Sequence, residues 1–338
     1  MSRRARGLTA HSSMIPEIFM YRPRTVVTLA VSLVAVLVAG RALDAQIVRT
    51  GDPTKRGLSE ADFPRVQRLA DGVYSYEALR SAGAERFTTV SLFVVTPAGV
   101  LVADGQGNAT ETKRMVDEIA KITPRPITHV IVCSDHGDHT GGNASFPAGA
   151  AFYAHPTSKA ILEASAARGG RAGEAPARPP IIPVENRTVL TLGGREVQLL
   201  FLGRAHTGGD LSVYLPAERI LFMSEAYLNR IFPAMRSAYP TEWVAAIEKA
   251  QAMPVDIFVP GHGFVETPQI LREELETFKR ALRQVIAEGK RLFDTKVPVD
   301  QAVEQARFGD LEGWTLRSSQ GATAIRRVYL ELEQSLPR

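Results

Sequence analysis

The pattern of apolar and polar positions predicts strands that alternate with helices. The runs T-T-V-S-L-F-V-V-T (88–96) and I-T-H-V-I-V-C (127–133) are apolar and rich in β-branched residues, which is typical of strands. The second run is apolar at nearly every position, as expected for a strand whose sheet is covered on both faces. Residues 109–122 instead place their apolar side chains along one face and predict a helix.

The same reading extends along most of the chain. Further strands are expected at 73–76, 99–104, 151–154, 188–192, 196–202, 211–215, 219–223 and 255–260, and further helices at 156–167 and 241–252. The Gly- and Pro-rich segment 168–180 is expected to form a mobile loop. From Thr267 a long amphipathic helix runs to about Gly289, and shorter helices follow near 298–307 and 321–333. The pattern predicts an α/β domain followed by helices.

Residues 1–45 differ from the rest in charge. Their arginines are Arg3, Arg4, Arg6, Arg22, Arg24 and Arg41, and their acidic residues are Glu17 and Asp44. Six minus two leaves +4, which equals the formal net charge of the whole chain. The uncharged run 25–40 is shorter than the roughly 20 residues of a spanning helix and resembles the core of a signal peptide. We interpret 1–45 as an export signal cut after Ala45, with an uncleaved membrane anchor as the alternative.

This interpretation changes what composition implies about partners. Without residues 1–45 the formal charge is zero, so no nucleic acid partner is expected and a small molecule is the expected substrate. A single cysteine, Cys133, excludes a disulfide scaffold but does not argue against periplasmic or secreted localisation. The expected organisation is a polar linker (46–66), an α/β domain (67–265) and C-terminal helices (266–338) that pack on that domain. The oligomeric state stays open.

Four of the seven histidines lie in glycine-rich segments that follow predicted strands. These segments are S-D-H-G-D-H-T-G-G (134–142), G-R-A-H-T-G-G-D (203–210) and P-G-H-G (260–263). Glycines let the backbone bend closely around a small centre, and imidazole and carboxylate side chains suit zinc, manganese or iron. The sequence therefore predicts a metal site. His129 and His155 are interpreted as structural, and Cys133 as a small core residue.

The segment 134–142 resembles the H-x-H-x-D-H signature and glycine-rich turn of the metallo-β-lactamase-fold hydrolase superfamily. His136, Asp138 and His139 match that signature, and the resemblance covers roughly 67–265. It implies a four-layer αββα sandwich with metals at one edge of two packed sheets. The same resemblance assigns His206 and His262 as the later metal ligands.

Two departures from the family pattern change the expected ligands. Ser134 replaces the first histidine, and Glu225 in L-F-M-S-E-A-Y replaces the bridging aspartate, unless the alignment places Ser224 there. One position then keeps Asp138, His139 and His262 with Glu225, and the other keeps His136 and His206 with Glu225. We expect one or two zinc ions, with iron or manganese as alternatives, and hypothesise that the Asp138 position binds more tightly. Asp135 is a further candidate oxygen ligand.

The resemblance implies an exported hydrolase that uses a metal-activated water. Asp138 is expected to be the catalytic residue, as both a ligand and the group that orients this water. An ester, thioester, lactone, amide or similar small molecule is the expected substrate. Three alternatives stay open: a true β-lactamase, an iron-dependent thiol or persulfide dioxygenase on the same fold, and a non-catalytic metal-binding homologue.

Overall fold

The computed structural model describes residues 48–167 and 180–337. The predicted signal peptide or anchor (1–45) and nearly all of the predicted loop 168–180 lie outside the described residues. Within those residues, no helix combines the length and the apolar character needed to cross a membrane. Residues from Val48 onward form one compact unit.

Strands make up the centre of this unit. They are β1 (Arg65–Ala70), β2 (Val73–Ala82), β3 (Glu85–Thr96), β4 (Gly99–Ala103), β5 (Ile127–Val132), β6 (Ala151–Ala154), β7 (Ile181–Pro183), β8 (Arg187–Leu192), β9 (Arg195–Phe201), β10 (Leu211–Leu215), β11 (Ile220–Leu228) and β12 (Ile257–His262). Hydrogen bonds join them in the order β7-β6-β5-β4-β3-β12-β11-β10-β9-β8, and β2 and β1 extend from β3. The two halves of this path meet where His262 of β12 pairs with Thr89 of β3.

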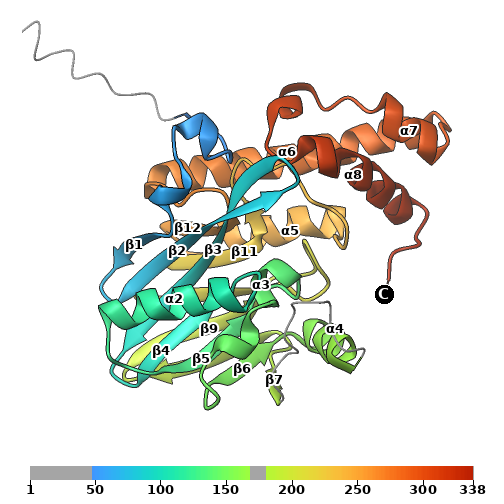
Figure 1. Cartoon of the computed structure of the whole chain (residues 1–338). Coiled ribbons are helices and arrows are strands. Elements are labelled where there is room, and N and C mark those ends of the chain that lie inside the picture. The colour runs from blue at the N-terminus through green and yellow to red at the C-terminus, as the bar shows by residue number, and fades with distance from the viewer. Residues whose placement is uncertain (1–47, 168–179, 338) are drawn as a thin grey trace, which may run out of the picture. The chain divides into compact units, whose positions relative to one another are not determined.

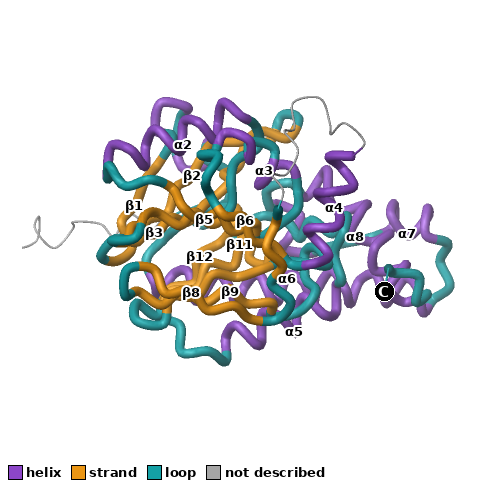
Figure 2. Tube along the Cα trace, turned by 90° about the horizontal axis from the view of Figure 1, so that it is seen from below, coloured by secondary structure: helices purple, strands orange, loops and turns teal. Residues whose placement is uncertain are grey.

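Helices cover the outer faces of the two halves. Met115 and Ile119 of α2 (Ala109–Ile122) and Leu162 of α4 (Pro156–Ala167) share one core cluster with β4 to β7. The helices α5 (Pro240–Gln251) and α6 (Pro268–Asp294) contact β11 and β12 instead. Figure 1 labels these helices, and Figure 2 shows the strands between α2 on one side and α5 on the other.

The largest core cluster fills the space between the two halves. It joins Ile131 and Tyr153 from one half to Leu199 and Val213 from the other. The arrangement confirms the expected four-layer α/β sandwich with C-terminal helices. Those helices are α6, α7 (Val299–Gln305) and α8 (Arg317–Leu332), and they lie together beside α5 in Figure 1.

The bounds of several elements can be compared with the bounds predicted from the sequence. The helix predicted over 109–122 is confirmed as α2, and its start is capped by Asn108, whose side chain accepts a hydrogen bond from the Glu111 amide at 2.9 Å. The strand predicted to end at residue 223 continues to Leu228 and is buried throughout. The sequence did not predict β1, because its polar residues mask the strand pattern.

The described part of the predicted linker packs against the domain. Arg49 pairs with Glu273 at 2.7 Å and with Glu274 at 2.9 Å, both on α6. Arg56 pairs with Glu266 and lies 4.0 Å from the centre of the Phe264 ring. These contacts hold the start of the described chain beside the end of β12.

Candidate metal centre

The first group of predicted ligands lies on a short turn after β5. His136 is the N-cap of the four-residue helix α3 (Gly137–Thr140), and Asp138 and His139 follow within that helix. The turn packs very closely on the segment that precedes α2. A Cβ atom at Gly141 would lie 2.2 Å from the Gly107 carbonyl oxygen, so only glycine fits this contact.

A bulge in β11 directs the side chain of Glu225, the predicted bridging carboxylate, toward the cluster. Ser224 has a positive φ of 48°, and the pairing of β11 with β12 shifts on both sides of it. Gly261 on β12 permits this conformation, because a Cβ atom there would lie 2.4 Å from the Ser224 carbonyl carbon. The Ser224 hydroxyl turns away and donates to Asp104 Oδ2 at 2.5 Å. Glu225, and not Ser224, therefore reaches the cluster.

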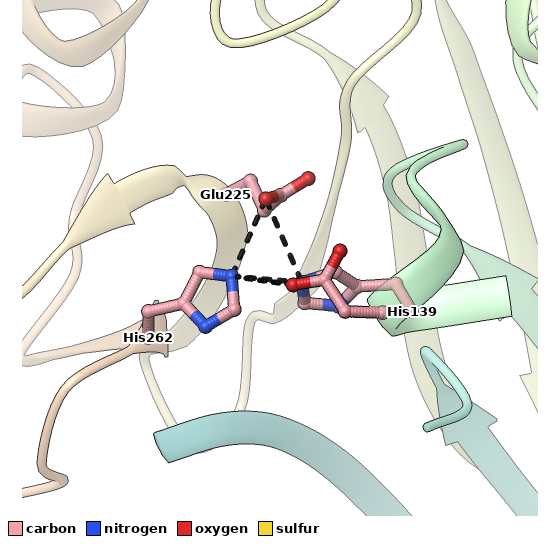
Figure 3. A group of neighbouring side chains, drawn as sticks. His139, Glu225 and His262 are labelled. Atoms are coloured by element: carbon pink, nitrogen blue, oxygen red, sulfur yellow. Dashed lines mark hydrogen bonds and ion pairs between the residues drawn. The ribbon is translucent and has the colours of Figure 1, made fainter. Parts of the chain in front are cut away.

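The fold brings all six predicted metal ligands together. Their candidate ligand atoms form two groups, each within 4.8 Å: Asp138, His139, Glu225 and His262 in one, and His136, His206 and Glu225 in the other. Three of them, His139, Glu225 and His262, come from different elements and point toward one another in Figure 3. Residues up to 126 positions apart in the chain thus share one site, from His136 to His262.

Glu225 faces both groups, one with each oxygen. Its Oε2 atom lies 3.1 Å from His136 Nδ1 and 3.1 Å from His206 Nδ1. Its Oε1 atom lies 3.3 Å from His262 Nε2 and 3.9 Å from His139 Nε2. The buried Ser134 hydroxyl donates a hydrogen bond to Oε2. Serine at this position therefore contacts the predicted bridging carboxylate and supplies no nitrogen ligand.

The chemistry of the cluster fits a divalent cation. His139 Nε2 and His262 Nε2 face each other at 3.3 Å. The buried Nδ1 atoms of His139 and His206 each lie 3.1 Å from a carboxylate oxygen, of Asp104 and Glu225 respectively. Nitrogen and oxygen donors that converge in this way suit zinc, manganese or iron.

Electrostatics also favour positive charge at this site. Burial opposes the protonated imidazole of His262, but the hydrogen bonds that this imidazole donates to Asp138 and Glu225 outweigh burial and raise the His262 pKa to about 10. Burial likewise opposes charge on His136, and Glu225 raises its pKa to about 9. The pKa of Glu225 falls well below its ordinary value, because the surrounding histidines outweigh burial. The cluster therefore attracts cations.

Several supporting residues were not predicted as part of the site. The Thr88 carbonyl oxygen lies 2.8 Å from His262 Nδ1, which directs Nε2 toward the cluster. Asp104 has a positive φ of 64°. Its Oδ2 atom lies 3.1 Å from His139 Nδ1, and its Oδ1 atom accepts a hydrogen bond from the Cys133 amide at 2.7 Å. The signal that could have indicated Asp104 is the segment V-A-D-G (102–105), which places an acidic residue and a glycine at the end of a predicted strand.

Other candidates lie outside both ligand groups. Asp135 accepts a hydrogen bond from the Ser158 hydroxyl at 3.0 Å. His155 stacks on Phe201 with ring centres 4.1 Å apart, and His129 stacks near Tyr153. Cys133 is buried, and burial raises the pKa of its thiol well above the ordinary value. None of these side chains belongs to the described cluster.

The cluster opens onto a cavity of about 340 Å³. Asp138 reaches it with a side chain that is 20% exposed, whereas the Glu225 side chain is 4% exposed. Walls come from β2, from the segment after β11, and from Leu316 and Gln320 at the start of α8. Glu85 joins the β2–β3 hairpin to α8, because it accepts hydrogen bonds from the Leu316 amide at 2.7 Å and the Ser318 hydroxyl at 2.9 Å.

Comparison with known proteins finds a family model and individual proteins that are similar to this chain. A model of the metallo-beta-lactamase superfamily matches residues 85–262, more than half of the 338-residue chain. The metallo-beta-lactamase type 2 of Bacillus cereus is 23% identical over 258 residues, which are 75% of this chain and 94% of that protein. The 2,4-dinitroanisole O-demethylase subunit alpha of Nocardioides sp. (strain JS1661) is 25% identical over 203 residues, which are 59% of this chain and 55% of that protein.

Solved structures share the fold. A metallo-beta-lactamase from Pontibacter korlensis aligns with a TM-score of 0.57 and 19% identity, over 65% of this chain and 99% of that one. A metallo-beta-lactamase from Hirschia baltica aligns with a TM-score of 0.54 and 20% identity, over 65% of this chain and 97% of that one. At such identities the likeness concerns the arrangement of strands and helices.

Proposed function

The chain belongs to the metallo-β-lactamase superfamily, whose members are generally hydrolases, and we propose that it is an exported zinc hydrolase of a small molecule. The bond that it cleaves is an ester, thioester, lactone or amide. One observation carries this proposal: six histidine and carboxylate side chains that could bind metal gather in two adjacent groups, and the cluster opens onto a cavity.

The two metal positions are proposed to differ in affinity. Asp138, His139, His262 and Glu225 offer four ligands, whereas His136, His206 and Glu225 offer three. The Ser134 hydrogen bond occupies Glu225 Oε2, the oxygen that faces the three-ligand group. A divalent ion held by these residues would supply Lewis acidity and would lower the pKa of water toward neutrality. We propose zinc, with iron or manganese as the alternative outcomes of metal analysis.

Asp138 is proposed as the catalytic residue. It lines the cavity, and its Oδ2 lies 3.3 Å from His262 Nε2. Although burial and Glu225 oppose its ionisation, the hydrogen bond from His262 and the charge of His139 hold the Asp138 pKa below its ordinary value. The ionised carboxylate can therefore orient a water molecule in the cavity and accept a hydrogen bond from it.

The test combines metal removal with one conservative substitution. The purified protein is analysed for metal and assayed on a panel of esters, thioesters, lactones, β-lactams and aryl methyl ethers. The β-lactams are included because one relative is named a metallo-beta-lactamase, and the aryl methyl ethers because another is named a 2,4-dinitroanisole O-demethylase subunit. Turnover should disappear with a chelator and return with zinc. Asp138→Asn should lower kcat about 100- to 10,000-fold at an unchanged circular dichroism spectrum.

Each alternative gives a distinct result. Activity that survives both chelation and Asp138→Asn would contradict the assignment. Bound iron and oxygen uptake with a thiol or persulfide would identify a dioxygenase. Metal binding without turnover of any substrate would favour a non-catalytic binding protein.

Export is a separate part of the proposal and rests on the arginine-flanked apolar run 25–40. Cell fractionation and intact mass test it. A released protein that begins near Gln46 supports cleavage after Ala45. A full-length protein that stays with the membrane indicates the uncleaved anchor, and a full-length protein in the cytosol contradicts export.

A further inference from the structure

Leu316, which lines the cavity, has an unusual backbone conformation. It is the N-cap residue of α8, with φ 67° and ψ 8°, in the left-handed region. Among the non-glycine residues that have a positive φ in the described segments, it alone carries an aliphatic side chain. The left-handed conformation brings the Cβ atom close to the following carbonyl oxygen, so a bulky side chain is costly there. Neighbouring segments must therefore impose this conformation.

Two segments hold the start of α8 in place. Glu85, at the start of β3, accepts hydrogen bonds from the Leu316 amide at 2.7 Å and from the Ser318 hydroxyl at 2.9 Å. The Thr315 carbonyl oxygen accepts a hydrogen bond from the Phe232 amide, in the segment after β11, at 2.9 Å. A strained backbone persists only where the surrounding structure fixes it in this way. The position of Leu316 is thus determined from both sides.

A leucine at this position does not serve the helix itself. Ser, Thr, Asp and Asn are preferred at the N-cap, because their side chains accept a hydrogen bond from an amide of the first turn. Leu316 provides no such side-chain cap. Asparagine would suit both the left-handed backbone and the N-cap. A residue that is unfavourable for its own helix, and that lines the cavity of a candidate active site, indicates a role in that site.

Leu316 completes an apolar wall beside the candidate metal ligands. Phe87, Leu228 and Ile231 also belong to this wall. Each of the four residues is at most 6% exposed and belongs to the largest core cluster, so the wall is backed by close-packed side chains. The wall begins at the ligands, because the ring centre of Phe87 lies 5.3 Å from that of His262. Such a wall contacts an apolar group and limits its size.

The cavity is small enough for one side chain to affect what it accepts. Its volume of about 340 Å³ lies near the lower end of the range for ligand pockets, about 300 to 1,000 Å³. Leu316 also lies beyond residues 85–262, the segment that matches the family model. Its effect on the cavity therefore comes from the C-terminal helices of this chain and not from the matched segment.

We propose that Leu316 limits the size of the acyl group that the enzyme accepts, and that Glu85 is a positioning residue that holds Leu316 in the wall. This inference rests on the proposed hydrolase function. The substrates are acyl compounds with a short aliphatic chain, which contacts the apolar wall while the scissile carbonyl lies at the cluster. A longer chain meets the Leu316 side chain, which cannot move aside because its backbone is fixed by Glu85 and Phe232.

The p-nitrophenyl esters of acetate, butyrate, hexanoate and octanoate test the proposal on the metal-loaded full chain. Leu316→Ala should raise the ratio of kcat/KM for octanoate to kcat/KM for butyrate about 10- to 100-fold, because a methylene in an apolar pocket changes specificity by this order. Leu330→Ala is the matched control on α8, since Leu330 is 39% exposed and lies outside the cavity lining. It should leave the ratio unchanged. A ratio that Leu316→Ala does not raise, or that both variants raise alike, would overturn the proposal.

Two substitutions of Glu85 test its positioning role. Glu85→Ala removes both acceptor oxygens and should raise the octanoate-to-butyrate ratio about two- to tenfold, the equivalent of one hydrogen bond. Glu85→Gln keeps one acceptor oxygen for the Leu316 amide and should return the ratio to within about twofold of the wild type. Equal losses on all four esters in Glu85→Ala, with no change in the ratio, would indicate a merely structural role and overturn this assignment.

A binding measurement separates this inference from the hydrolase function. Aliphatic hydroxamic acids bind metal ions through two oxygen atoms and place an alkyl chain beside the metal without any turnover. Calorimetry on the metal-loaded protein compares butyrohydroxamic acid with octanohydroxamic acid. Tighter binding of the shorter compound that is lost in Leu316→Ala and kept in Leu330→Ala supports the size limit even if no ester is cleaved. Tighter binding of the longer compound to the wild type, or equal shifts in the two variants, contradicts it even if esters are hydrolysed.

Discussion

A buried carboxyl outside both groups of candidate metal ligands should make stability depend on pH. The Glu77 side chain is 1% exposed. Its Oε2 atom forms an ion pair with Arg65 at 3.1 Å, and its Oε1 atom accepts a hydrogen bond from the Val265 amide at 3.1 Å. Burial is the dominant effect, and Glu266 adds to it, whereas Arg65, the Val265 amide and Arg56 oppose it. The net result raises the Glu77 pKa from 4.5 to about 7.

The sign of the effect follows from proton linkage. Between pH 4.5 and pH 7 the folded chain keeps a proton on Glu77 that the unfolded chain has released. Raising the pH across this interval therefore favours unfolding. At 1.36 kcal/mol per pH unit, the stability contribution that is present below pH 4.5 and lost by pH 7 is about 3 kcal/mol.

Glu77→Gln should remove this dependence, because glutamine is the neutral analogue of the protonated carboxyl. The free energy of unfolding is measured by urea denaturation from pH 4.5 to 8, with saturating metal, for both proteins. The variant should become more stable relative to the wild type by up to about 3 kcal/mol as the pH rises.

Taking the difference at each pH cancels the other titrating groups and the metal. Glu163→Gln, at a glutamate whose side chain is 49% exposed, controls for loss of one surface charge. A difference between Glu77→Gln and wild type that stays constant with pH, or that falls as the pH rises, would refute the reasoning.

Two further changes test the site and its support. Ser134→His removes the hydroxyl that holds Glu225 Oε2 and adds a nitrogen ligand, so it should raise tightly bound metal from about one to about two equivalents, measured after dialysis against a weak chelator. Two equivalents already retained by the wild type would contradict unequal sites. Trp243→Ala removes a buried indole that donates a hydrogen bond to the Ala226 carbonyl at 2.9 Å and whose ring centre lies 5.2 Å from that of His206. It should lower the free energy of unfolding, measured by denaturation, by about 3 to 5 kcal/mol. A loss below about 1 kcal/mol would contradict this packing role.

The histidines of the cluster could be predicted from the sequence as candidate ligands because each lies in a short local pattern. His136 and His139 share one turn, and His206 and His262 each follow a predicted strand. Parallel strands end at the same edge of a sheet, so residues that follow them meet in space. The order of strands and helices was accessible for the same reason: burial imposes a period on the residues of each element.

Other parts of the site depend on contacts between distant segments. Nothing near Arg80 in the sequence marks it, since its place beside Asp138 depends on how β2 lies along β3. Leu316 and Gln320 reach the cavity only because α8 packs near the β2–β3 hairpin, where Glu85 accepts a hydrogen bond from the Leu316 amide. Side-chain periodicity describes which face an element buries but not which other element covers it.

The two departures from the family signature form one compensated change. An isolated Ser134 in the buried cluster would leave a hydroxyl without a partner, and Glu225 alone would add an unneutralised carboxylate oxygen. In the fold the Ser134 hydroxyl donates to Glu225 Oε2, while Oε1 faces His262. The bulge at Ser224 and the glycine at 261 set the carboxylate between the two groups of ligands. Restoring histidine at 134 would therefore change what Glu225 contacts as well as the number of nitrogen ligands.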